Sequence, residues 1–177
     1  MLIDDFMPNF EFSDAQKANI NAGRAQVFRG IKTFNMGDST SIRWLFKMRG
    51  IPTENLTISD FEKANFKILA EKPDEEVVLG LIGEFKSLTG GLVQIESDKF
   101  RDFNHAGFIK AVWNLAVTET ANGKSSLTTE IRIHPTDAGS LSKVKTYWGM
   151  LKPPSQMIRK EILKLIKKQA EREAKGK

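Results

Sequence analysis

The sequence contains no cysteine, which excludes a disulfide framework, a thiolate metal site and a cysteine nucleophile. The two histidines, His105 and His134, stand far apart, and neither has a carboxylate or a second histidine at ligand spacing. Phosphate loops, dinucleotide fingerprints and nucleophile elbows are also missing. The sequence therefore points to no catalytic motif, and we expect neither a metal nor a cofactor.

Long apolar runs are also missing: none approaches the ~20 residues that a membrane-spanning helix needs. The first ten residues, MLIDDFMPNF, lack the basic and apolar regions of a secretory signal. Hydrophobic residues make up 40% of the 177 residues, which is enough to bury a core. We therefore expect a soluble, cytoplasmic protein with a single domain over 1–177, of which 171–177 form a frayed tail.

Positive charge is concentrated at one end of the chain. Residues 141–177 hold 11 Lys and Arg against 3 Asp and Glu, a balance of +8, whereas residues 1–140 have a balance of −3. A basic helix can contact nucleic acid or an anionic membrane, but it can equally be the solvated face of an amphipathic helix. Few aromatic residues interrupt the segment, so we expect no specific nucleic-acid binding and at most weak contact with an anionic surface.

The order of the expected elements is the most informative property of the chain. Apolar and polar residues alternate over Asn9–Ile20, which predicts a strand. Apolar residues at helical spacing over Ala22–Phe34, and again from Ile42 to Phe46, predict two short helices. Asp38 or Ser39 can cap the second of them, which we expect to end at Gly50, shortly before Pro52.

Two hairpins and a long helix follow. Phe66–Ala70 and Glu76–Ile82 flank one turn, and Phe108–Thr118 and Ser125–His134 flank a turn that contains Asn-Gly. The stretch from Asp137 to Glu173 then has an apolar stripe at helical spacing. We expect Pro153-Pro154 to interrupt this helix, because neither residue has an amide hydrogen to donate. We expect Arg159 and the lysines after it to lie on the face turned away from the stripe.

This order resembles the helix-grip fold of the START-like, or SRPBCC, superfamily, and is most similar to an uncharacterised bacterial group within it. The segments that carry the resemblance are Arg43–Gly50, Glu76–Gly83, Ala111–Leu115, Leu127–Ile133 and Tyr147-Trp148. The resemblance implies an α+β fold in which a curved antiparallel sheet wraps around a long C-terminal helix. It also implies a cavity between sheet and helix, suited to a small hydrophobic ligand.

The inward side of that sheet supplies the candidate ligand-binding residues. Alternation over Ile109–Val117 places Ala111, Trp113 and Leu115 on one apolar face. Trp113 can be a wall of the cavity or an ordinary core residue. Trp148, on the apolar stripe of the last helix, is the candidate on the opposite side.

Glu130 and Arg132 are the only candidates for catalysis. They share the polar side of the strand Ser125–His134, which can be an exposed face with a weak ion pair or the lining of the cavity. Three hypotheses follow from the sequence. The protein binds a small hydrophobic molecule, such as a lipid or a polyketide-like compound; or it is a cyclase or dehydratase that uses Glu130 and Arg132; or it binds a partner through its basic C-terminal helix. The oligomeric state stays open.

Overall fold

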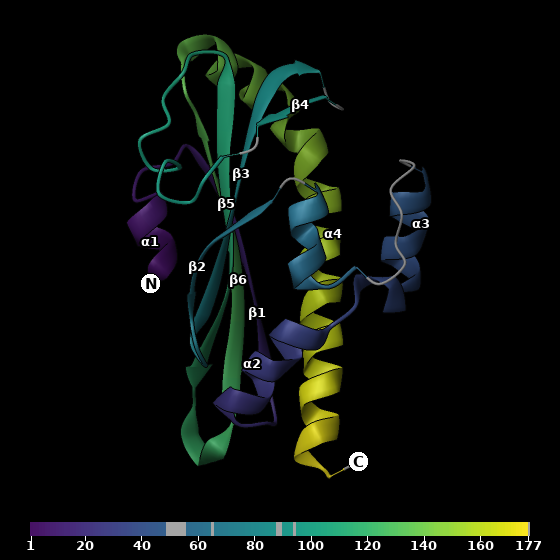
Figure 1. Ribbon diagram of the computed structural model, residues 1–177. Coiled ribbons are helices and arrows are strands. Elements are labelled where there is room, and N and C mark those ends of the chain that lie inside the picture. The colour runs from purple at the N-terminus through teal and green to yellow at the C-terminus, as the bar shows by residue number, and fades with distance from the viewer. Residues whose placement is uncertain (49–55, 65, 88–89, 94, 177) are drawn as a thin grey trace.

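The computed structural model describes residues 1–48, 56–64, 66–87, 90–93 and 95–176 (Figure 1). The elements, in chain order, are α1 (Leu2–Phe6), β1 (Phe12–Ile20), α2 (Arg24–Thr33), η1 (Met36–Asp38), α3 (Thr40–Met48), η2 (Ile58–Ala64), β2 (Lys67–Lys72), β3 (Glu76–Ser87), β4 (Gly90–Val93), β5 (Phe108–Glu119), η3 (Ala121–Gly123), β6 (Ser125–Pro135) and α4 (Ala138–Ala174). The predicted first strand, the two short helices after it and both hairpins are confirmed. The expected stop of the second helix at Gly50 lies outside the described residues.

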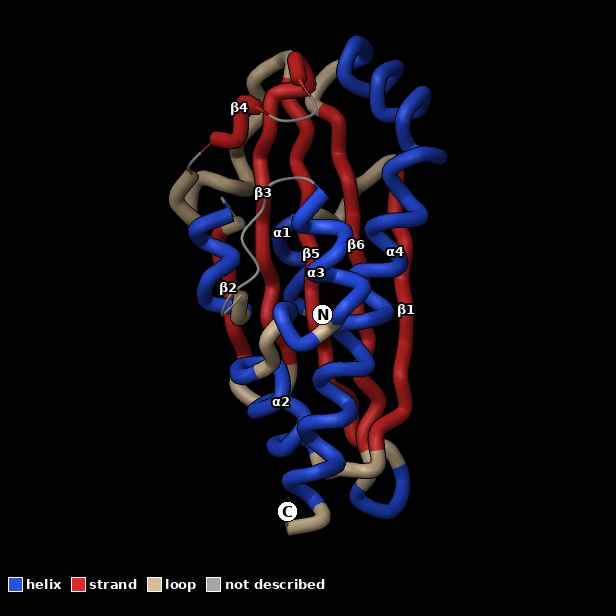
Figure 2. Tube along the Cα trace, turned by 90° about the vertical axis from the view of Figure 1, so that its right-hand side faces the viewer, coloured by secondary structure: helices blue, strands red, loops and turns tan. Residues whose placement is uncertain are grey.

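The strands form one antiparallel sheet in the order β1-β6-β5-β3-β2, and β4 pairs with β3 (Figure 2). The sheet lies between α1 on one side and α4 on the other (Figure 1). This is the α+β helix-grip arrangement that the sequence predicts, with a curved sheet and a long C-terminal helix. We call the side that faces α4 the concave face and the other side the outer face.

The main core fills the concave face beneath α2 and the second half of α4. Leu79, Trp113, Leu115 and Leu127 of the sheet pack there with apolar residues of the two helices. Between the helices, a Cβ built on Gly30 of α2 would lie 3.2 Å from Cγ2 of Ile166, so this glycine allows α2 and α4 to approach closely.

A second core covers the outer face. It joins α1 and the segment before β5 to the strands and consists of Ile3, Phe6, Met7, Leu69, Val78, Ile82, Phe100 and Val112. A Cβ on Gly80 would lie 2.8 Å from a ring carbon of Phe100, so the glycine makes room for that ring. Alternation in β5 therefore separates two buried faces rather than a buried face from a solvated one, and Asn114 and Ala116 of the outer side are buried too.

The expected interruption of the last helix at Pro153-Pro154 is wrong. The helix α4 is continuous from Ala138 to Ala174 with both prolines inside it. Figure 1 shows that the first turns of α4 lie obliquely over the end of the sheet and that the helix then turns to run along it. Loss of two backbone donors and the bulk of the rings bend a helix without ending it when tertiary packing holds both halves.

Asp137 caps α4. Its carboxylate accepts hydrogen bonds from the amides of Gly139 and Ser140 and from the hydroxyl of Ser140. It also accepts one from the amide of Gly107, whose φ of +91° suits glycine. The hydrogen bond from Gly107 and those from Ser140 lower the pKa of Asp137 from its ordinary value of 3.8 to about 2.

Substitution Asp137→Asn should flatten the acid limb of the stability curve. A carboxyl whose pKa is lowered in the folded state contributes stability above its unfolded pKa, and that stability disappears as the pH falls through the folded pKa. Wild type should therefore lose this contribution between pH 3.8 and about 2, and the variant should lose less in the same window. Urea unfolding at several pH values measures this, and identical pH dependence in both proteins would contradict it.

Candidate functional site

The register of the sheet arranges side chains in rows across the concave face. Leu81, Ala111, Ile133 and Phe12 are successive partners on β3, β5, β6 and β1. We call these four residues the apolar row. The next row toward the core consists of Leu79, Trp113, Ile131 and Asp14, and the one after it of Val77, Leu115, Thr129 and Gln16.

Trp113 and Leu115 lie in the main core. Trp113 is 5% exposed, its ring packs edge-on against Phe61 with centroids 5.4 Å apart, and its indole donates to the hydroxyl of Thr129. Leu115 is fully buried. Both residues face α4, as predicted, and their contacts are those of core packing. Their role as ligand contacts stays a prediction.

The apolar row is less enclosed than the rows below it. Neither core cluster includes its four residues. Leu81, Ile133 and Phe12 are only half-buried, whereas Ala111 between them is buried. Ala111 contributes a single methyl group in the middle of the row, where a bulky side chain would fill the surface. Trp148 of α4 covers one end, with its ring 5.3 Å from that of Phe12. The row and Trp148 thus form an apolar surface between the sheet and the first half of α4.

A buried polar cluster adjoins the apolar row. Asp14 follows Phe12 on the concave side of β1, and its carboxylate binds the guanidinium of Arg159 from α4. Arg159 also donates to the backbone carbonyl of Asp14 at 2.6 Å. Gln156 donates to the Asp14 carboxylate at 2.7 Å, and the Lys152 ammonium lies 3.3 Å from it. Two cations thus share one carboxylate beside the apolar row.

The expectation that Arg159 lies on the solvent face of the helix is wrong, since the residue is 4% exposed. Burial acts to raise the pKa of Asp14, but the hydrogen bond from Gln156 and the charge of Arg159 outweigh it, so the pKa of Asp14 is lower than usual. The sequence does carry a signal for this pair. Asp14 stands in the inward series of an alternating strand, and a buried carboxylate needs a cation.

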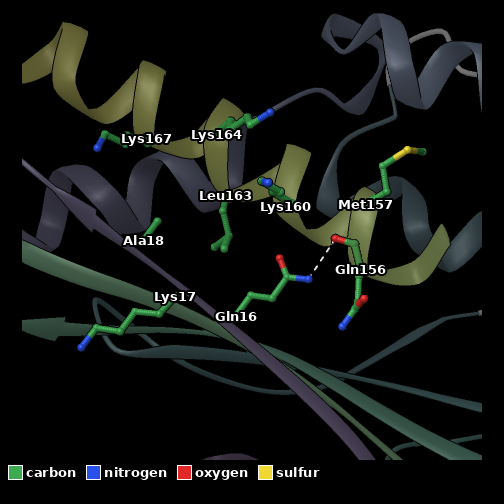
Figure 3. A pocket seen from close by; sticks show the side chains of 9 residues that line it. All are labelled: Gln16, Lys17, Ala18, Gln156, Met157, Lys160, Leu163, Lys164 and Lys167. Carbon is green, nitrogen blue, oxygen red and sulfur yellow. Dashed lines mark hydrogen bonds between the residues drawn. The ribbon is translucent and has the colours of Figure 1, made fainter. Parts of the chain in front are cut away.

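A groove of about 770 Å³ lies between β1 and α4, next to the polar cluster (Figure 3). Gln16 crosses it and donates to the backbone carbonyl of Gln156 at 2.9 Å. Ala18 and Leu163 are apolar residues of its lining, which also includes Lys17, Lys160, Lys164 and Lys167. Two of these lysines have a carboxylate partner: Glu161 forms an ion pair with Lys164, and Glu171 lies 3.8 Å from Lys167.

Glu130 and Arg132 lie on the outer face, on the opposite side of the sheet from α4. Arg132 is 8% exposed and binds Glu130 at 2.8 Å, Asp4 at 2.8 Å and the backbone carbonyl of Met7 at 2.9 Å. Burial alone would lower its pKa, but hydrogen bonds to Glu130 and Asp4 raise it. The interpretation that places this pair in the space between sheet and C-terminal helix is therefore wrong, and so is the alternative of a freely solvated pair.

These residues belong to a polar network that fastens the N-terminal segment to the sheet. Glu76 accepts hydrogen bonds from the amides of Leu2 and Ile3 at 2.7 and 3.2 Å. Asn114 donates to Glu76 at 2.7 Å and accepts from the amide of Glu130 at 2.8 Å. Each buried polar side chain of this network therefore has a partner. The network explains why charged side chains lie on this face without giving them a catalytic role.

Arg132→Met should be strongly destabilising. Removing one partner of a buried pair typically costs about 3–5 kcal/mol, because the other charge stays buried without compensation. Adding Glu130→Leu should restore only part of the loss, since the carbonyl of Met7 still lacks its donor. Urea unfolding of wild type, the two single variants and the double variant measures this. Full recovery in the double variant, or single variants near wild type, would contradict the fastening role.

No family model matches this chain, and no curated protein does. Solved structures of similar fold exist. One is a conserved protein from Geobacillus kaustophilus, 15% identical, with a TM-score of 0.46 and with 90% of this chain and 95% of that chain covered. Another is the hypothetical protein jhp0584 from Helicobacter pylori, 10% identical, with a TM-score of 0.43 and with 94% and 93% covered.

A third similar structure is the di-domain ARO/CYC BexL from the BE-7585A biosynthetic pathway. It is 12% identical, with a TM-score of 0.40, and the match covers 94% of this chain and 53% of that chain. At these identities and TM-scores the comparisons assign neither a family nor a function to the chain, so the site has to be interpreted from its own geometry.

Within the described part of the chain, no group of three or more His, Cys, Asp or Glu residues could hold a metal ion. Among the same residues, no helix combines the length and apolarity that crossing a bilayer requires. The cytoplasmic location stays a prediction.

Proposed function

We propose that the protein binds a small, largely apolar molecule, lipid or polyketide-like, between the sheet and the first half of α4. The observation that supports this is the apolar row, whose side chains line the concave face outside the packed core. A ligand pocket is typically apolar with a few placed polar groups, and the row adjoins such a set at Asp14.

The polar cluster favours a ligand with an anionic end. Arg159 and Lys152 carry two positive charges against the single carboxylate of Asp14. Arg159 is buried and donates to both the backbone carbonyl and the carboxylate of Asp14 on β1. The side chain of Lys152 is about two-fifths exposed and can therefore turn to a new partner. A carboxylate or phosphate next to the Lys152 ammonium would complete the charge balance, with its apolar chain lying along the row.

A cyclase or dehydratase that uses Glu130 and Arg132 has no support from this geometry. Both residues are on the far side of the sheet from the proposed ligand, where Asp4 of α1 and the carbonyl of Met7 bind Arg132. The polar groups on the concave side are engaged in holding α4 to β1, and we assign no reaction to them.

The test uses the fluorescent fatty acid dansylundecanoic acid, with oleic acid as competitor. Ala111→Phe places a ring in the middle of the row and should weaken binding about tenfold or more. The matched control is Ala15→Phe, the same substitution at an exposed position on the outer side of β1, which should leave binding unchanged. Circular dichroism establishes that both variants are folded. Absence of binding to wild type, or equal loss in both variants, would contradict the proposal.

A second variant tests whether the site recognises the anionic end of the ligand, and it does so without filling the apolar surface. Lys152→Met should weaken the binding of oleic acid about tenfold, since a hydrogen bond to a charged group contributes about 1.5 kcal/mol or more, and it should leave the binding of oleyl alcohol unchanged. Equal affinity of the variant and wild type for both compounds would show that Lys152 plays no part in recognition, while leaving the role of the apolar row to the Ala111→Phe result.

A further inference from the structure

The helix α3 exposes large apolar side chains. Trp44 is 64% exposed and Met48 is 66% exposed, while Ile42 on the opposite side is fully buried in the main core. Figures 1 and 2 show α3 as the outermost element on the side of the molecule that carries α4. An exposed tryptophan and methionine on one short helix are unusual on a protein surface that only faces water.

The helix α4 adds apolar residues to the same side. Met150 is 58% exposed and Met157 is 37% exposed. Met157 and Glu161 lie four residues apart on one face of α4, and Glu161 accepts a hydrogen bond from the hydroxyl of Ser39 just before α3. Figure 3 shows Met157 pointing away from the strands and Gln156 pointing toward them. Met157 and α3 therefore share one side. Together with Met150, which is exposed on the part of α4 before Pro153-Pro154, they form what we call the docking face: Trp44, Met48, Met150 and Met157.

Cations surround the docking face, and carboxylates are missing from both helices over most of their length. Residues 40–48 and 138–160 contain no Asp or Glu. Arg43 and Lys47 flank Trp44 on α3, and Lys145 and Lys160 are exposed on α4. Two carboxylates close to these helices have cationic partners: Asp14 is held by Arg159 beneath α4, and Glu161 binds Lys164 and the hydroxyl of Ser39. Asp38, just before α3, is exposed.

We propose that the docking face binds the surface of an anionic lipid bilayer, with Trp44, Met48 and the two methionines of α4 entering the interface. Exposed apolar side chains among cations on one helix face are the pattern of helices that lie in the membrane interface, where tryptophan is favoured. Each basic residue near an anionic membrane surface contributes ~1 kcal/mol. Nucleic acid would use the cations but gives no role to exposed methionines, and so the apolar residues favour lipid.

The surface is separate from the proposed ligand site, although both use the first half of α4. Trp148 and Lys152 belong to the concave side of the helix, and Met150 and Met157 to its exposed side. Docking requires no bound ligand, so a failure of the ligand proposal leaves this one intact, and the reverse also holds.

The test is co-sedimentation of the full chain with vesicles of phosphatidylcholine alone and of equal parts phosphatidylcholine and phosphatidylglycerol. We expect binding to the mixed vesicles at least about tenfold tighter than to the neutral ones, with a blue shift of tryptophan emission. Arg43→Glu with Lys47→Glu should weaken this binding about twenty-five-fold or more, since each basic residue near an anionic surface strengthens binding about fivefold and the reversed charges are also repelled. Trp44→Ser with Met48→Ser should weaken binding and remove the blue shift.

The matched control is Lys168→Glu with Arg172→Glu, the same change of charge on exposed residues of the second half of α4. Lys168 lies 11 residues past Met157, about 16 Å along the helix, which exceeds the screening length of ~8 Å at physiological ionic strength. This variant should retain most of the binding. Equal binding to both vesicle types, equal loss in the control, an unchanged emission spectrum, or binding to duplex DNA or polyglutamate without binding to vesicles would each overturn the proposal.

Discussion

The ion pair between Arg159 of α4 and Asp14 of the edge strand β1 fixes how the long helix lies on the sheet. Both groups are almost fully buried, so the pair tolerates little change in the distance between helix and strand. On one side of it, α2 and the second half of α4 close over Trp113 and Leu115 and form a packed core. On the other side, the helix continues past two prolines toward the end of the sheet, and the apolar row stays outside the core.

The outer face depends on a different constraint, namely that the central strands β3 and β5 are buried on both sides. The segment before β1 folds back as α1, Glu76 and Arg132 satisfy backbone groups of this segment, and Asn114 donates a hydrogen bond to Glu76. Charged residues in the middle of the sheet therefore hold the N-terminal segment in place. In the sequence, the charges of Glu130 and Arg132 suggest a catalytic role, but in the structure these side chains stabilise the fold.

The fold could be predicted from the sequence because it follows local patterns: alternation in β1, β5 and β6, an Asn-Gly turn, and a long apolar stripe in α4. Contacts between residues that are far apart in the sequence could not be predicted in this way. Nothing local shows that the N-terminal segment binds Arg132, or that Arg159 turns inward while the lysines after it stay at the surface. The prolines inside α4 were misleading for the same reason, since only packing on both halves keeps the helix continuous. Trp113 was placed on the correct face, but its core contacts depend on Phe61, which comes from a separate part of the chain.

The central claim is that the apolar row, and not the outer face or the packed core, receives the ligand. Methyl-labelled protein titrated with oleic acid and followed by nuclear magnetic resonance tests it most directly. The account predicts that the methyl signals of Leu81, Ala111 and Ile133 shift first and furthest. Signals of Val78 and Val112, buried on the other side of the same strands, should stay in place. Shifts concentrated on Val78 and Val112, or no shifts at any concentration, would contradict the account.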